Sequence, residues 1–239
     1  MEWLWQLDQD LFRAIHGQMR REWLDPFMLI LTQTGLGHVQ FAALALACLP
    51  QQKRWIVPSV AGSIFLLGLF AEQWRDAFRF QLFANGLALT IIGMILVSLI
   101  HFDLKKYALP ALLSGLLSGA MHLVLRGLVD RVRPSTIYES PLEQVFANTS
   151  FPSGHTTTSF AIAISLIFTT WKTDAAWLGW VALMWAVLVG LSRIYVGVHW
   201  PTDVIGAAGL GLVAAAIVQL LIGRKFENAS QPSGGSART

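Results

Sequence analysis

The stretch Ser192-Arg-Ile-Tyr-Val-Gly-Val-His-Trp-Pro-Thr-Asp203 joins two long apolar segments, residues 176–196 and 203–223. Each segment reaches the length of about 20 residues that an apolar α-helix needs to cross roughly 30 Å of hydrocarbon. The composition agrees, because 54% of the residues are hydrophobic and only 13% are charged. A chain this apolar cannot hide its surface in a water-soluble core, so we expect an integral membrane protein.

Other apolar segments predict the rest of the fold. The candidate crossings are residues 27–50, 55–72, 80–101, 107–130, 155–171, 176–196 and 203–223. The first is the least regular, because Gly35-Leu36-Gly37 could break it into an interfacial turn and a shorter crossing. We therefore expect an all-α, polytopic transmembrane helix bundle of six or seven crossings that forms one domain over residues 27–223. The pair of crossings within 55–101 has no function that the sequence reveals.

The two termini differ from this apolar domain. Residues 1–26 contain apolar side chains at helical spacing, separated by charged ones: Trp3, Leu4, Leu7, Leu11 and Ile15, with Asp8, Asp10 and Arg13 between them. This pattern predicts an amphipathic helix that lies in the headgroup layer, or alternatively a soluble helix packed on the domain. Residues 224–239 contain Ser-Gly-Gly-Ser, which is typical of a disordered tail.

The positions of lysine and arginine predict the orientation in the membrane. One side of a seven-crossing bundle would hold Lys53, Arg54, Lys105, Lys106, Lys172, Arg224 and Lys225. Because cytoplasmic loops carry an excess of basic residues, this side and the tail should be cytoplasmic. The polar motifs lie on the other side, so we expect an inner (plasma) membrane protein with a site facing the periplasm or exterior. The net charge is only +3 and the basic residues are scattered, which argues against a nucleic-acid partner.

Two arginines mark the end of the segment 107–130. Arg126 and Arg133 are two helical turns apart, so on a continuing helix both would project from one face toward the outer mouth. Arg131 would lie on another face and meet lipid headgroups. Snorkelling at a helix end explains either arginine alone, whereas the pair followed by Pro134 favours an anion site.

Two histidines complete the polar motifs. Phe151-Pro-Ser-Gly-His155 precedes an apolar helix, whose free backbone N–H groups and dipole favour a phosphate. His199 and Asp203 are close enough for the carboxylate to hold one ring nitrogen and raise the nucleophilicity of the other. Helix capping is the alternative role for Ser153 and Asp203. Arg193 joins Arg126 and Arg133 in a cluster of positive charges. Such a cluster has a high free energy beside a bilayer unless an anion neutralises it, which points to a phosphate site.

In order and spacing, these residues resemble the three signature motifs of the type 2 phosphatidic acid phosphatase superfamily: Arg126-x6-Arg133-Pro134, Pro152-Ser-Gly-His155 and Ser192-Arg193-x5-His199-x3-Asp203. The resemblance covers about residues 107–223 and departs from the usual pattern at Arg126, where the family has lysine. It implies that His199 attacks phosphorus, that Asp203 orients His199, and that His155 protonates the leaving group and later activates water. The groups that it implies for holding the phosphate oxygens are Arg126, Arg133, Arg193, the Ser153 hydroxyl and the Gly154 N–H. No metal or cofactor is expected, because no carboxylate pair or histidine cluster stands at metal-ligand spacing near these motifs.

The function that this resemblance implies is hydrolysis of a lipid phosphate or pyrophosphate among the membrane lipids. The runs Leu7 to Gly17 and Trp23 to Met28 look like the start of bacterial undecaprenyl pyrophosphate phosphatases, so that substrate ranks first. Phosphatidylglycerol phosphate, phosphatidic acid and the lipid A phosphates are the alternatives, and residues 131–154, with Tyr138, Glu139 and Glu143, are expected to help select among them. From other classes, a lipid-phosphate transporter would use the arginines only to bind, and a silent membrane scaffold would have no activity. The sequence gives no oligomeric state.

Overall fold

The computed structural model of this chain describes residues 2–48, 104–138 and 149–230, and every regular element in these residues is a helix. The amino-terminal elements are α1 (Glu2–Phe12), the π-helical turn η1 (Arg13–Gln18), α2 (Asp25–Thr34) and α3 (Gly37–Ala47). The elements from residue 104 on are α6 (Lys105–Leu128), the 3-10 turn η3 (Pro134–Thr136), α7 (Gly154–Thr170), α8 (Ala176–Tyr195) and α9 (Pro201–Ser230). The all-helical fold class predicted from the sequence is thus confirmed for the described residues.

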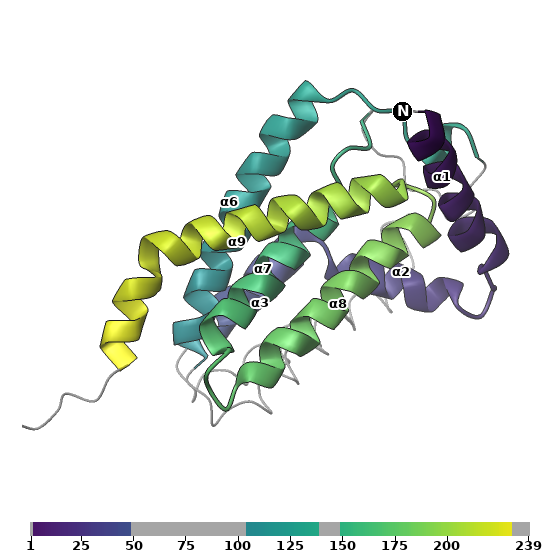
Figure 1. The fold of residues 1–239 in the computed structure, drawn as a ribbon. Coiled ribbons are helices and arrows are strands. Elements are labelled where there is room, and N and C mark those ends of the chain that lie inside the picture. The colour runs from purple at the N-terminus through teal and green to yellow at the C-terminus, as the bar shows by residue number, and fades with distance from the viewer. Residues whose placement is uncertain (1, 49–103, 139–148, 231–239) are drawn as a thin grey trace, which may run out of the picture.

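Helix α7 forms the centre of the bundle. It contacts α6, α8 and α9, whereas α3 packs on α6, and α2 packs on α8 (Figure 1). Two glycines allow the backbones of neighbouring helices to approach closely. A Cβ added at Gly179 of α8 would lie 2.8 Å from the Ile167 Cα, and one at Gly211 of α9 would lie 2.8 Å from the Thr157 carbonyl oxygen. Small residues that let helix backbones meet in this way are typical of membrane helix interfaces.

Three helices in the described residues are long and apolar enough to cross a membrane: α6, α8 and the Pro201–Ile222 part of α9. The pair α2 and α3 becomes a fourth if it counts as one span, but it is bent by 58° at the break. This bend falls at Gly35-Leu36, where the sequence predicts one. Helix α7 has 17 residues, which is at the lower end of the crossing length.

Several predicted segments differ from the structure or lie outside the described residues. The predicted crossings 55–72 and 80–101 lie outside them, as do Glu139 and Glu143. Helix α9 continues through 224–230, which the sequence assigns to a tail, and 231–239 are not among the described residues.

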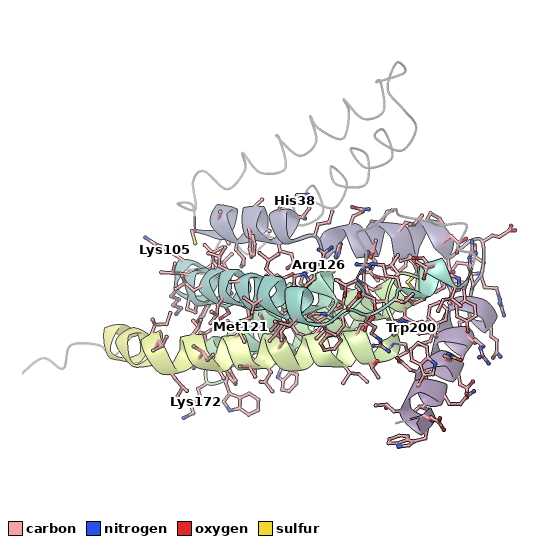
Figure 2. The ribbon with its side chains drawn as sticks, turned by 90° about the horizontal axis from the view of Figure 1, so that it is seen from above. His38, Lys105, Met121, Arg126, Lys172 and Trp200 are labelled. Atoms are coloured by element: carbon pink, nitrogen blue, oxygen red, sulfur yellow. The ribbon has the colours of Figure 1, made fainter. Side chains whose placement is uncertain are left out.

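The helix ends place the sequence motifs together. Figure 2 shows Lys105 and Lys172 toward one end of the bundle and Trp200 toward the other, with Arg126 between them. The second end gathers the last turns of α6 and α8 and the first turns of α7 and α9, because successive helices run in opposite directions. Helix α1 lies beside the junction of α8 and α9 at this end (Figure 1). The four helix ends therefore surround a single region of polar side chains.

Candidate active site

Hydrogen bonds to backbone carbonyl oxygens join the three motifs directly. The Ser153 N–H donates to the Asp203 carbonyl oxygen at 3.4 Å, which links the second motif to the third. Nη1 of Arg133 donates to the Val198 carbonyl oxygen at 2.9 Å, which links the first motif to the third. Residues far apart in the sequence thus form one site at one end of the bundle.

His199 occupies the middle of this site and faces a different partner with each ring nitrogen. Its Nδ1 lies 3.5 Å from Oδ2 of Asp203, and its Nε2 lies 3.4 Å from Nη1 of Arg133. The first distance exceeds that of an ordinary N–H···O bond, so the interaction with the carboxylate is mainly electrostatic. Asp203 is fully buried, and its Oδ2 also accepts the Trp200 N–H at 2.8 Å. Nε2 is therefore the ring nitrogen that faces the Arg133 guanidinium, away from the carboxylate.

The protonation of His199 follows from its burial. Burial lowers the pKa of His199 to about 4, although the hydrogen bond and negative charge of Asp203 oppose this shift. The imidazole is therefore neutral near pH 7. A neutral imidazole has a free lone pair, which a nucleophile or a general base requires.

Arg133 and Arg193 lie within electrostatic range of the histidine, and Arg126 lies within range of Arg133. Arg193 is 1% exposed, and its Nη1 donates to Oγ1 of Thr32 at 2.7 Å. Arg133 is also buried, and its burial together with the positive charge of Arg126 lowers its pKa. Arg126 is half-buried in the last turn of α6. Buried cations that repel one another in this way form a site that an anion would stabilise.

The second motif forms the start of α7. Ser153 is fully buried, and its Oγ accepts a hydrogen bond from Oγ1 of Thr156 at 2.9 Å, which leaves its own proton available to donate. Ser153 makes no side-chain cap to the helix, so the capping role that the sequence allowed is not what the structure has. A Cβ added at Gly154 would lie 3.1 Å from Nε2 of His122, so this helix start is closely covered by α6.

His155 lies against the break between α2 and α3. A Cβ added at Gly35 would be 3.2 Å from its Cδ2 atom, and the ring is within electrostatic range of Arg193 and His199. At this end of the bundle Arg126 lies within electrostatic range of Arg133, and the contacts above gather the other predicted phosphate-binding and catalytic residues, which are Arg133, Ser153, Gly154, His155, Arg193, His199 and Asp203. The structure also adds Thr32, which sequence reasoning missed although a polar pair, Thr32-Gln33, inside an apolar segment was a usable signal.

The prediction that Arg131 meets lipid headgroups is wrong. Its Nη1 donates to Oδ1 of Asp203 at 2.5 Å and to Oγ1 of Thr202 at 2.7 Å, and its Nη2 pairs with Asp8 of α1. The prediction assumed a helix that continues to Arg133, but α6 ends at Leu128, and Val129 is extended, with φ −115° and ψ 108°. Residues beyond a helix end do not keep the helical faces, so spacing alone misplaced Arg131.

No group of three or more His, Cys, Asp or Glu side chains that could hold a metal ion occurs within residues 2–48, 104–138 and 149–230. The acidic side chains at the site pair with Arg131 instead.

Fold and site together define a class of protein: a helical protein with candidate membrane spans and a cluster of arginines beside a histidine–aspartate pair. Residues 107–227 match the PAP2 superfamily, which is half of the chain, and the chain belongs to this family.

Individual relatives extend this result. Undecaprenyl-diphosphatase BcrC of Bacillus subtilis is 31% identical over 148 residues, which are 60% of this chain and 72% of that protein. Phosphatidylglycerophosphatase B of Bacillus subtilis is 33% identical over 110 residues, 41% of this chain and 50% of that protein. The crystal structure of Aquifex aeolicus LpxE has the same fold, with a TM-score of 0.55 and 23% identity over 90% of this chain and 95% of that one.

Proposed function

We propose that this protein is an integral membrane lipid phosphatase that works through a phosphohistidine intermediate. The observation that carries the proposal is the position of His199, with the Asp203 carboxylate at its Nδ1 and the Arg133 guanidinium at its Nε2. A carboxylate that holds one nitrogen of a neutral imidazole leaves the other free to attack, and the cation beside that nitrogen marks where a phosphate would sit. Membership of the PAP2 superfamily supports the same activity.

The proposed reaction has two displacements at phosphorus. His199 Nε2 attacks and forms an N–P bond while the bond to the leaving oxygen breaks, and His155 gives that oxygen a proton. His155 then takes a proton from water, whose oxygen attacks phosphorus and releases phosphate from Nε2. Histidine–carboxylate contacts are often long before substrate binds and tighten in the complex, which accommodates the 3.5 Å contact to Asp203.

The arginines have the role that metal ions have in other phosphoryl-transfer enzymes. Phosphoryl transfer depends mainly on positioning and on stabilising charge at the equatorial oxygens. Arg126, Arg133 and Arg193 supply three positive charges, and the Ser153 hydroxyl and Gly154 N–H supply two more donors. We therefore propose that turnover needs no metal ion.

Undecaprenyl pyrophosphate is the substrate that we propose first. Undecaprenyl-diphosphatase BcrC matches this chain over 72% of its own length at 31% identity, whereas phosphatidylglycerophosphatase B matches over 50% of its own length. Phosphatidylglycerol phosphate, phosphatidic acid and the lipid A phosphates are the alternatives. The first of these is supported by the similarity to a phosphatidylglycerophosphatase.

The proposed arrangement in the membrane has six or seven crossings, an interfacial α1 and a site that faces the periplasm or exterior. Exposed aromatic side chains on the amino-terminal segment support the interfacial position, since Trp3 is 70% exposed and Trp23 is 76% exposed. Tryptophan is enriched where a membrane meets water. The positions of Lys105 and Lys172, at the end of the bundle away from the site, support the orientation (Figure 2).

Phosphate release by the detergent-solubilised protein tests this function. With undecaprenyl pyrophosphate as substrate, we expect turnover that persists in EDTA, is inhibited by orthovanadate and is lost by at least about 10³-fold in His199→Ala. Acid-labile phosphate bound to the protein should form in wild type and be missing in His199→Ala. Turnover that stops with EDTA and returns with magnesium would contradict the mechanism, and a His199→Ala protein with wild-type turnover would contradict the function.

A further inference from the structure

A buried acid connects the amino-terminal helix to the site. Asp8 of α1 is 1% exposed, although neighbouring acids on this helix, such as Asp10, are exposed. Its Oδ1 accepts the Thr202 N–H at 2.9 Å, and its Oδ2 accepts from Oγ1 of Thr202 at 2.7 Å and from Arg131. A carboxylate this well buried is expensive unless all its partners are in place, so the contact fixes α1 against the start of α9.

Arg131 bridges this acid to the proposed catalytic pair. One arm of its guanidinium meets Asp8, and the other meets Oδ1 of Asp203 at 2.5 Å. The guanidinium also faces the rings of Trp5 and Trp200, with its Cζ at 5.6 and 5.8 Å from the ring centroids. The planar fork of arginine is suited to hold two carboxylates at once in a fixed orientation, which lysine cannot do.

The two oxygens of Asp203 have separate partners as a result. Oδ1 is held by Arg131, whereas Oδ2 faces Nδ1 of His199 and accepts the Trp200 N–H. Rotation of the carboxylate would carry Oδ2 away from the imidazole, and the Arg131 contact opposes that rotation. Asp8 has a second effect, since it offsets the charge of Arg131 and so leaves Asp203 with more of its negative charge to orient His199.

We propose that Asp8 and Arg131 are positioning residues for the reaction, acting on His199 through Asp203. The proposal rests on the proposed function. It assigns to α1 a role in catalysis that is separate from attachment to the membrane. Removing a group that orients a catalytic residue without contacting the substrate typically lowers activity by about 10–100-fold.

The test is a mutant cycle on kcat for undecaprenyl pyrophosphate hydrolysis. Asp8→Asn is measured in the wild type and in Asp203→Asn. We expect Asp8→Asn to lower kcat by about 10-fold in the wild type with KM changed less than about 2-fold, because the phosphate ligands are untouched. In Asp203→Asn, which itself loses roughly 10²-fold, Asp8→Asn should cause no further loss. The matched control is Asp10→Asn on the exposed face of the same helix, which should leave kcat unchanged.

Two outcomes would overturn the proposal. One is wild-type kcat in Asp8→Asn. The other is an equal fold-loss in both backgrounds, which would mean that Asp8 supports the fold and does not act through Asp203. If Asp8→Asn does not yield folded protein, the cycle is run with Arg131→Lys, which keeps the charge and loses the double bridge, and the same two outcomes decide. Turnover that survives in His199→Ala would overturn the proposed function instead, so the two failures are distinguishable.

Discussion

The substitution Gly35→Ala, at the break between α2 and α3, tests how closely the site is packed. Gly35 ends α2 with φ −78° and ψ −7°, a conformation that alanine adopts without strain. A Cβ at this position would nevertheless lie 2.5 Å from Cγ1 of Val189 and 3.2 Å from Cδ2 of His155. Any effect of Gly35→Ala must therefore come from these contacts and not from the backbone.

The size of the effect follows from the distances. Two carbons in contact rest about 3.5–4.0 Å apart, so the new methyl group would have to push Val189 or the break between the helices by about 1 Å. Val189 is fully buried and β-branched, so it has little freedom to turn away. Overpacking of this kind costs about 1–3 kcal/mol, and a displacement of about 1 Å near a reacting group can lower the rate by about 10²-fold. We expect kcat to fall by about 10–100-fold and the melting temperature to fall.

The assay is phosphate release from undecaprenyl pyrophosphate, with thermal unfolding measured on the same samples. Gly119→Ala is the control, because an added Cβ there meets nothing within 4 Å. Removing the clashing atom by Val189→Ala in the Gly35→Ala protein should restore part of kcat. Wild-type kcat and melting temperature in Gly35→Ala would refute the packing of the break against His155.

Two further predictions concern the arginine cluster and the proposed nucleophile, His199. Thr32→Val keeps the shape of the side chain but removes the acceptor of the 2.7 Å hydrogen bond from Arg193, and it should lower kcat/KM by about 10-fold, since hydrogen bonds to charged groups contribute about 1.5–3 kcal/mol. An unchanged kcat/KM would show that Arg193 does not depend on this contact. Because burial lowers the pKa of His199 to about 4, the imidazole stays neutral until the pH falls through that value. Protonation of His199 should therefore make kcat/KM fall on the acid side near pH 4, and we call this fall the acid limb of the enzyme. Asp203→Asn should move this limb to lower pH, because the carboxylate raises the pKa of His199, whereas a limb from substrate ionisation would stay in place. An enzyme limb near pH 6.5 would contradict the burial of the free imidazole.

Local sequence pattern predicted the parts of the site that lie within one short segment. His199 and Asp203 are four residues apart at the start of a helix, and the structure has their side chains facing each other. The capping contact considered for Asp203 is also present, since the oxygen that faces His199 accepts the Trp200 N–H at the start of α9. The bend at Gly35-Leu36 was readable for the same reason, because glycines that interrupt an apolar run act locally.

Hydrophobic length and residue spacing are properties of single segments, so they were enough to predict a helical membrane protein with polar motifs at its helix ends. The residues that contact those motifs from other parts of the chain were known only once the helices were placed in space. Asp8 and Arg131 are distant in the chain, and Thr32 lies on another helix from Arg193. Periodicity assigns a residue to one face of its own helix, but it does not say which helices meet or where a chain turns once the helix has ended. The partners of the proposed catalytic residues therefore became visible only when the helices were packed.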